Sequence, residues 1–215
     1  MQEFIKVTGM VIGAFSHGEY DKRIVILTKE RGKITAFANG ARRQGSRFGA
    51  STEPFVFGEF ELFAGKNSNT LQNVKVLNYF EFLRNDLDAV LYAMFFLELT
   101  DYYAVENSEE ALLLLLLYRA LQGLKSEKLS NEFVKTVFEI KTYMIEGEFI
   151  PIDEIGSYEG GVYSIIRRIE DSSIEKLFDF CPEERYFENI REIARLERHR
   201  LVEVKLKSLE LIEGL

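Results

Sequence analysis

The sequence contains few of the residues that build disulfides and metal sites. Among its 215 residues are one cysteine, Cys181, and two histidines, His17 and His199. A single cysteine excludes an internal disulfide and a multi-cysteine zinc site, and it fits a reducing compartment. Neither histidine has a second histidine at metal-ligand spacing. We therefore expect no bound metal and no cofactor.

Long apolar runs are also missing. The leucine block, Ala111–Leu117, has seven residues, and no apolar run approaches the length of about 20 that a membrane-spanning helix needs. The first residues, Met1–Lys6, lack the basic segment and apolar stretch of a signal peptide. These two absences lead us to expect a cytoplasmic protein.

Catalytic motifs are scarce. Gly65-Lys66 is similar to the Gly-Lys pair of a Walker phosphate loop, but the earlier glycine and the following Ser or Thr of that motif are not at the required positions. A hairpin turn is therefore the favoured interpretation. Cys181 lies in an acidic region, which disfavours a reactive thiolate. His199 is typical of a surface residue near a helix C-terminus. We predict a protein that is not an enzyme, although a small hydrolase without a recognisable motif is a weaker alternative.

Charge is distributed unevenly along the chain, whose net charge is −8. Residues 1–80 hold 11 Lys and Arg against 7 Asp and Glu, a balance of +4, and residues 81–215 hold 16 against 28, a balance of −12. Such asymmetry indicates two units with different partners. We expect a domain at 1–80 and another at 81–215.

The first 80 residues show the pattern of short strands separated by turns. Gly9 and Gly13 allow the first strand to bend, and Gly32 favours a turn that requires positive φ. Five strands in about 80 residues predict a small closed or nearly closed barrel. The expected strands are 4–15, 23–28, 33–39, 55–63 and 70–77.

From Asn85 the apolar period changes to that of helices. Asn85 or Asp86 can cap the first helix, and Asn107 with Glu110 resembles a capping box before the leucine block. That block is apolar all round and is expected at the buried centre of a helical domain. Ser130 is the expected cap of a third helix. A break at 147–161 and helices at 173–180 and 183–201 complete the pattern.

The segment from Gly40 to Gly49 holds Arg42, Arg43 and Arg47 and lies within a stretch free of acidic residues. Guanidinium groups grip phosphate in a bidentate manner, and glycines let backbone N–H groups approach. These arginines are candidate DNA contacts, and a solvated cationic loop is the alternative. Lys22 and Arg23 extend the surface if the turn before the second strand lies on the same side. The aromatic residues that could stack on bases are Phe15, Tyr20, Phe37 and Phe48.

The order and spacing of several motifs resemble the N-terminal region of the bacterial recombination mediator RecO. They are Gly18-Glu19-Tyr20-Asp21-Lys22, Leu27-Thr28-Lys29-Glu30-Arg31-Gly32-Lys33, Gly40-Ala41-Arg42-Arg43, Ser46-Arg47-Phe48-Gly49 and Pro54-Phe55. Weaker similarity continues to Gly160-Gly161-Val162 and Leu206-Lys207-Ser208-Leu209.

The resemblance implies an α+β fold in which a five-stranded OB-fold β-barrel precedes an all-α C-terminal domain. It also implies a non-catalytic role in DNA repair and recombination, in the cytoplasm and associated with the nucleoid. Such proteins bind single- and double-stranded DNA and anneal complementary strands. With RecR, they load recombinase onto strands coated by single-stranded DNA-binding protein (SSB).

The sequence departs from the family at one region. Many members carry a four-cysteine zinc module in the part corresponding to 147–165, where this chain has no cysteine. The region is interpreted as a cysteine-free remnant of that module, and we expect no zinc there.

A basic stripe is expected on the last long helix. Arg191, Arg195 and Arg198 recur at i, i+4 and i+7, beside apolar positions. An ordinary solvated face, with Glu188 and Glu192 paired to Arg191 and Arg195, is one interpretation. The other is a dock for the acidic C-terminal tail of SSB, because cations beside apolar groups suit such a peptide. For the whole chain, the alternative to a DNA-binding mediator is an adaptor whose barrel binds protein or RNA.

Overall fold

The computed structural model describes residues 3–65 and 68–214. The chain divides into two compact units. The first comprises Met1–Glu81 with Thr100–Leu114, and the second comprises Phe82–Leu99 with Leu115–Leu215. The sequence patterns placed one boundary near residue 80 and did not anticipate that residues 100–114 return to the first unit.

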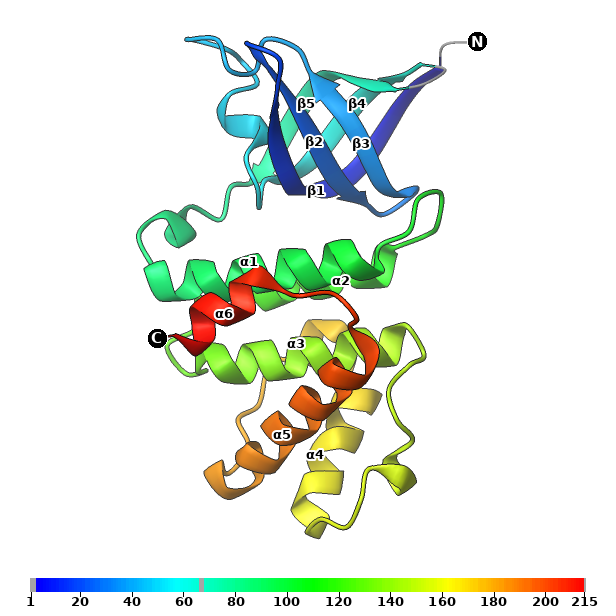
Figure 1. The fold of residues 1–215 in the computed structure, drawn as a ribbon, viewed down its shortest axis with the longest axis vertical. Coiled ribbons are helices and arrows are strands. Elements are labelled where there is room, and N and C mark those ends of the chain that lie inside the picture. Colours follow the sequence, from blue (N-terminus) through cyan, green and yellow to red (C-terminus); the bar gives the residue numbers. More distant parts are fainter. Residues whose placement is uncertain (1–2, 66–67, 215) are drawn as a thin grey trace. The chain divides into compact units, whose positions relative to one another are not determined.

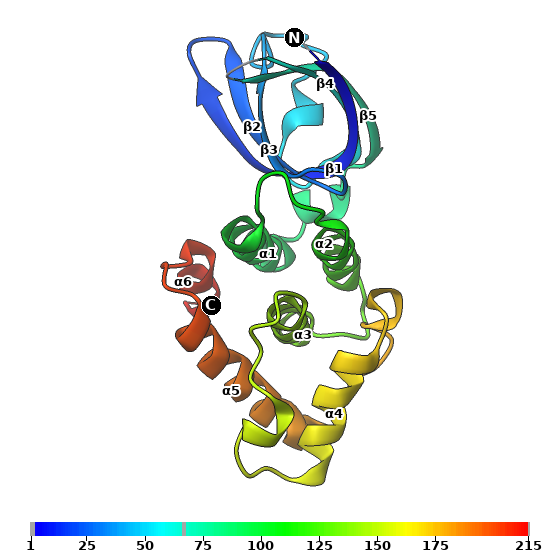
Figure 2. The ribbon, with the colours of Figure 1, turned by 90° about the vertical axis from the view of Figure 1, so that its right-hand side faces the viewer.

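The first unit is built on a closed five-stranded barrel (Figures 1 and 2). Its strands follow the order β1-β2-β3-β5-β4 around the barrel. All neighbouring strands are antiparallel except β3 and β5, which are parallel. This arrangement is that of an OB-fold, so the predicted barrel is confirmed. The strands are β1 (Glu3–His17), β2 (Asp21–Thr28), β3 (Gly32–Ala38), β4 (Phe57–Ala64) and β5 (Asn69–Asn78).

Strand β1 closes the barrel because it pairs with two neighbours. Its first half pairs with β4 and its second half with β2, and the change occurs around Gly9. A β-carbon on Gly9 would lie 2.4 Å from the carbonyl oxygen of Leu27. The pairing with β2 shifts between Val11 and Gly13. A bulge and a glycine at a close approach are the features that let a barrel strand bend.

The barrel core is formed by alternate residues of the strands and by three residues that follow β3. Ala41, Phe48 and Val56 are buried with the strand residues. They belong to the segment 39–56, which joins β3 to β4 and contains the short 3-10 helix η1 (Ala50–Thr52). This segment is therefore anchored through its apolar residues, while its arginines remain exposed.

Six helices are described after the barrel strands. The first begins after Asp86, whose Oδ1 accepts a hydrogen bond from the backbone N–H of Ala89 at 2.9 Å. Ser130 Oγ accepts from the N–H of Phe133 at 3.1 Å, so both predicted caps are confirmed. Within the described residues, no helix is both long and apolar enough to cross a membrane. The helices are α1 (Leu87–Tyr103), α2 (Ala111–Gly123), α3 (Asn131–Ile145), α4 (Gly160–Asp171), α5 (Glu184–Leu201) and α6 (Lys207–Glu213).

Some local expectations were wrong. The capping box fails because α2 begins at Ala111, and Asn107 has φ of 60° in the turn before it. Residues 173–180 contain only a 3-10 turn, Ile174–Lys176, whereas α4 and α6 were not expected. Helix α4 begins at a pair of glycines, which is a weak helix signal; its buried side includes Val162, which packs in the second unit.

Helix α3 lies at the buried centre of the second unit and is buried without interruption from Phe133 to Tyr143. The leucine block of α2 is also mostly buried, as expected, since Leu113, Leu114, Leu116 and Leu117 are at most 5% exposed; Leu112 is 58% exposed. Figure 2 shows α3 enclosed by the other helices of this unit. Its buried charges are paired: Glu139 Oε1 accepts from Arg198 at 2.7 Å, and Glu139 Oε2 lies 3.2 Å from Lys135 Nζ. Lys141 donates to carbonyl oxygens at the end of α4. The composition of α3 does not indicate its complete burial, because α3 contains charged residues whose partners lie within the helical unit.

Candidate nucleic-acid interface

The arginine-rich segment is fixed to one end of the barrel, beside the β1–β2 turn (Figure 1). The backbone N–H of Arg42 donates to the carbonyl of Tyr20 at 2.8 Å. The N–H of Gly40 donates to Asp21 Oδ1 at 2.7 Å. A chain of hydrogen-bonded turns follows, from Arg43 to Gly49. These contacts place the segment next to the start of β2, which is the condition for Lys22 and Arg23 to share its surface.

The three arginines of the segment make different local contacts. Arg42 Nη1 donates to the carbonyl of Gly18 at 3.3 Å. The Arg43 guanidinium lies 5.1 Å from the centre of the Tyr20 ring. The Arg47 guanidinium lies 4.6 Å from the ring of Phe48. Among the described residues, none of these arginines pairs with a carboxylate. Their positive charge is therefore not neutralised within the barrel unit.

Arg47 also depends on an irregularity of the sheet. Its Nη2 donates to the carbonyl of Gln72 at 2.9 Å. Gln72 lies where the β4–β5 pairing shifts, because Leu71 and Asn73 have partners and Gln72 has none in the ladder. A bulge frees a backbone carbonyl from the ladder, and this carbonyl orients the Arg47 side chain.

Lys22 and Arg23 are adjacent in β2 but have different environments. Lys22 Nζ forms an ion pair with Glu53 Oε1 at 2.5 Å and donates to the carbonyl of Gly49 at 3.3 Å. Its side chain is only 14% exposed. Arg23 instead lies 4.5 Å from the ring of Phe15, and its charge has no carboxylate partner within the described residues. Lys22 thus ties the segment 39–56 to β2, whereas Arg23 adds to the exposed positive surface.

Several cations of the barrel form ion pairs, among them Arg31 with Glu3. Lys6 and Lys75 both approach Glu59, and Lys33 pairs with Asp101. Hydrogen bonding to Lys6 lowers the pKa of the Glu59 carboxyl below its ordinary value, which keeps that pair charged. Among the described cations without a carboxylate partner, Lys29 lies in the β2–β3 turn, and four arginines lie toward the β1–β2 turn and the segment 39–56. We call Arg23, Arg42, Arg43 and Arg47 the arginine end.

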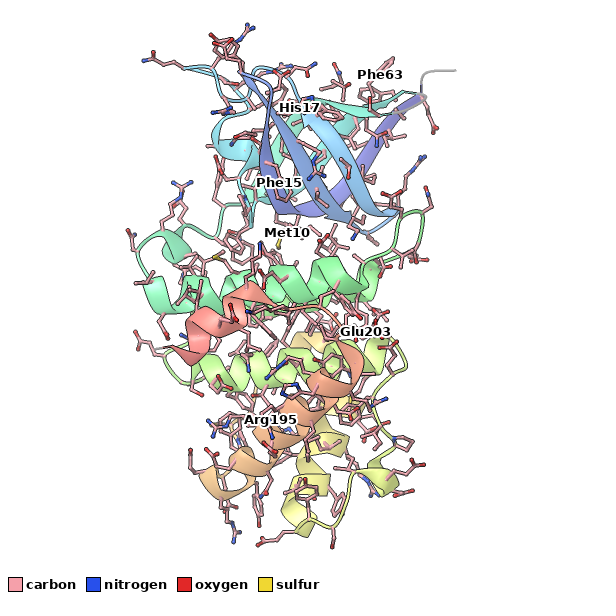
Figure 3. The ribbon with its side chains drawn as sticks, viewed as in Figure 1. Met10, Phe15, His17, Phe63, Arg195 and Glu203 are labelled. Atoms are coloured by element: carbon pink, nitrogen blue, oxygen red, sulfur yellow. The ribbon has the colours of Figure 1, made fainter. Side chains whose placement is uncertain are left out.

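Aromatic rings accompany the arginine end. Phe15, Arg23 and Phe37 form one row across β1, β2 and β3, because each is the register partner of the next. Phe15 is 50% exposed, and it lies on the same strand as His17, whose ring is 4.6 Å from that of Phe37 (Figure 3). Of the other predicted stacking residues, Tyr20 is exposed and Phe48 is buried in the core. Phe48 is therefore unavailable to a base.

The arginines of α5 do not form one exposed stripe. Arg191 pairs with Glu188, and Arg195 with Glu192, as the solvated-face interpretation expected. Both arginine side chains are about half exposed, and Arg195 projects from α5 in Figure 3. Arg198 is 8% exposed and pairs with buried Glu139. The structure therefore removes Arg198 from the predicted docking surface, because its guanidinium points into the helical core.

The region 147–165 contains a short 3-10 helix, Ile152–Glu154, and the beginning of α4. Across the residues that the structure describes, no three or more His, Cys, Asp or Glu side chains gather as metal ligands would. The absence of zinc stays a prediction. Lys66, part of the predicted hairpin turn, lies outside the described residues.

Residues 100–114 contribute to the barrel unit in a way that the sequence patterns did not indicate. The N–H of Lys33 donates to the carbonyl of Val105, and the N–H of Asn107 donates to that of Arg31, each at 3.0 Å. Gly32 has φ of 61°, and a β-carbon there would lie 2.0 Å from the Val105 carbonyl oxygen. The positive φ was predicted, but a backbone docked on this turn leaves no periodic signal in the sequence.

Comparison with known proteins identifies similar chains. Residues 1–80 match the family model described as recombination protein O N terminal. The chain is 36% identical over 138 residues to the DNA repair protein RecO of Acetivibrio thermocellus, covering 64% of this chain and 55% of that protein. It is 30% identical over 166 residues to the DNA repair protein RecO of Bacillus pumilus, covering 76% and 64%.

A further relative, the DNA repair protein RecO of Alkaliphilus metalliredigens, is 36% identical over 143 residues, which cover 66% of this chain and 58% of that protein. The matched part thus spans between about half and two thirds of these relatives' lengths. It continues beyond the barrel into the helical unit. With an OB-fold barrel at the matched N-terminal region and this similarity along most of its length, the chain belongs to the RecO family of DNA repair proteins.

Proposed function

We propose that this chain is a DNA-binding recombination mediator that holds the phosphates of single- and double-stranded DNA at its arginine end. The observation that carries the proposal is the group of four arginines, Arg23, Arg42, Arg43 and Arg47, without carboxylate partners in the described residues. Uncompensated guanidinium groups attract phosphate and release its counterions on binding. The names of the relatives, DNA repair protein RecO, support a role in DNA repair.

Family membership supports a wider role in DNA repair as part of this proposal. The chain promotes annealing of complementary strands and, together with RecR, helps to load recombinase onto DNA coated with SSB. Neutralisation of phosphate charge by arginines reduces the repulsion between two strands, which favours annealing. This activity requires no nucleophile or bound nucleotide, so the proposed role is not that of an enzyme. The proposed place of action is the nucleoid, in the cytoplasm.

The proposal is tested by a salt titration of single-stranded DNA binding. Replacing Arg42, Arg43 and Arg47 together by alanine should weaken binding of every sequence, because interactions with phosphates carry no sequence information. The log–log salt dependence should become shallower by about 0.7 for each phosphate that the variant no longer neutralises. Fluorescence anisotropy at several salt concentrations measures both quantities.

A matched control is Lys75→Ala. Lys75 is exposed on β5 and already faces Glu59, so its removal should leave affinity and salt dependence nearly unchanged. A triple variant that binds like the parent protein would contradict the assignment of the arginine end.

The alternative is an adaptor in which the barrel binds protein or RNA and the acidic helical unit docks a basic partner. Its basis is the balance of −12 over residues 81–215. If the parent protein does not bind DNA, or binds it with no dependence on salt, the adaptor becomes the better explanation.

A further inference from the structure

The segment 39–56 carries three of the four arginines of the arginine end, and backbone hydrogen bonds fix it near both of its ends. Near its start, the N–H of Arg42 donates to the β1–β2 turn. Near its end, the N–H of Phe55 donates to the carbonyl of Val11 in β1 at 2.9 Å. Phe55 has φ of 73°, a conformation that a bulky residue keeps only where its surroundings hold it there. The residues between these two anchors depend on other contacts.

Those intervening residues, 43–53, form a succession of hydrogen-bonded turns, and Phe48 packs in the barrel core. A lysine from β2 meets them on both sides of η1. Lys22 Nζ donates to the carbonyl of Gly49, just before η1, at 3.3 Å, and to Glu53 Oε1, just after η1, at 2.5 Å. We call the Lys22 ammonium, the Gly49 carbonyl and the Glu53 carboxylate the Lys22 latch.

Lys22 lies on the side of β2 that faces the barrel interior. Successive residues of a strand point to opposite faces, and Ile24, two residues further along, is fully buried in the core. Ala38, the register partner of Lys22 in β3, is also a core residue. Arg23 therefore points to the outer face, whereas the Lys22 side chain, only 14% exposed, is directed at the segment.

The contacts of the Lys22 latch favour a role in positioning over a role in direct binding. An ammonium group has three N–H donors, and two of those of Lys22 are already used within the protein. The arginines of the segment, by contrast, have no carboxylate partner within the described residues. A loop that is ordered before binding avoids the loss of conformational entropy that binding would otherwise cost. Holding the segment in place should therefore increase its affinity for phosphates.

From this arrangement we infer that Lys22 is a positioning residue, which holds the arginine-rich segment in its binding conformation through Glu53 and does not itself contact phosphate. The inference rests on the proposed function and deepens it, because it separates the cations that bind DNA from the cation that orders them. It also gives an acidic residue a favourable role. Glu53 strengthens DNA binding, although its charge alone would repel phosphate.

Replacing Glu53 by alanine tests the latch, because the two possible roles of Lys22 predict effects of opposite sign. If the latch orders the segment, the affinity for single-stranded DNA should fall about fivefold even though a negative charge has been removed. If Lys22 contacted phosphate, its release from Glu53 would leave the affinity unchanged or higher. The Glu53 side chain is half exposed, so the fold should tolerate the change.

The matched control is Glu59→Ala. Glu59 also pairs with a lysine of the barrel, Lys6, at 2.7 Å, but it lies on β4 outside the segment. Its removal changes the net charge by the same amount, so the affinity for DNA should stay at the parent value or rise slightly.

Two further measurements do not depend on the sign of the Glu53 effect. Hydrogen exchange of the backbone N–H groups of residues 43–53 should be faster in Glu53→Ala than in the parent, and that of β4 should be unchanged. Lys22→Met should also weaken binding about fivefold, but the log–log salt dependence should keep its parent slope. A slope shallower by about 0.7 would show that Lys22 neutralises a phosphate, which would overturn the inference.

The parent protein separates the two possible failures. A parent that does not bind DNA would overturn the proposed function itself. A parent that binds DNA with a steep salt dependence, together with a Glu53→Ala variant that binds as tightly as the parent or more tightly, would overturn only the role of the Lys22 latch.

Discussion

At the scale of single residues, Arg195 and Arg198 lie only three residues apart in α5, but one forms an exposed ion pair and the other a buried one. Arg195 is half exposed and pairs with Glu192 on its own helix. Arg198 is buried and joins α5 to Glu139 of α3, which also approaches Lys135. Exposed ion pairs contribute little to stability, whereas removing one partner from a buried pair leaves the other charge uncompensated.

We therefore expect Arg198→Ala to lower the free energy of unfolding by about 3 kcal/mol. Arg195→Ala, the control on the same helix, should lower it by less than about 1 kcal/mol. Urea denaturation followed by circular dichroism measures both values. Similar decreases in the two variants would show that the Arg198–Glu139 pair does not hold α5 on α3.

At the scale of elements, α3 and α4 are joined by a lysine that reaches the end of a neighbouring helix. Lys141 Nζ donates to the carbonyls of Ile169 and Glu170, each at 2.8 Å, and to that of Ser172 at 3.3 Å. The last carbonyls of a helix have no partners within it. A cation placed there satisfies them and interacts favourably with the helix dipole.

Lys141→Met should lower the free energy of unfolding by about 1–3 kcal/mol, because the carbonyls lose their donor. Burial lowers the pKa of Lys141 in the folded protein below its ordinary 10.5. Between the folded and the unfolded pKa, the unfolded chain binds more protons, so the contribution of Lys141 to stability increases as pH rises. The difference between parent and variant should thus widen from pH 7 toward pH 10. Chemical denaturation at both pH values measures it, and a constant difference would contradict the perturbed pKa.

At the scale of the whole molecule, charge is uneven along the chain, with a balance of +4 over residues 1–80 and of −12 over residues 81–215. The candidate DNA contacts all lie in the first unit, and the exposed arginines of α5 lie in the second. Arg191 and Arg195, at i and i+4, are both about half exposed on α5. The proposed dock for the acidic tail of SSB therefore consists of Arg191 and Arg195, without Arg198.

Changing Arg191 and Arg195 to glutamate should abolish binding of an acidic peptide with apolar residues at its C-terminus. Binding of naked DNA should change by less than about twofold, since neither arginine belongs to the arginine end and each already pairs with a glutamate of its own helix. Calorimetry with the peptide and anisotropy with DNA measure the two affinities. Peptide binding that survives the double reversal would place the dock elsewhere in the helical unit.

Local signals in the sequence were sufficient for most elements. Alternation of apolar residues located the five strands, and Asp86 and Ser130 marked two helix starts, because these patterns depend on a few neighbouring residues. The signals failed where tertiary contacts decide. Glycines at 160 and 161 obscured α4, and Asn107 takes a left-handed conformation at the turn that meets β3.

The charge asymmetry, the barrel with its arginine-rich segment and the resemblance to RecO could all be read from the sequence, since each depends only on the order of the residues. Which cations are neutralised became clear only from the packed molecule: Lys22 by Glu53, Lys33 by Asp101 and Arg198 by Glu139. The same holds for residues 100–114, which join the barrel unit through backbone hydrogen bonds to Arg31 and Lys33. Helical and strand periodicity gives the direction of a side chain from its own element, but the identity of the group it meets depends on segments distant in the chain.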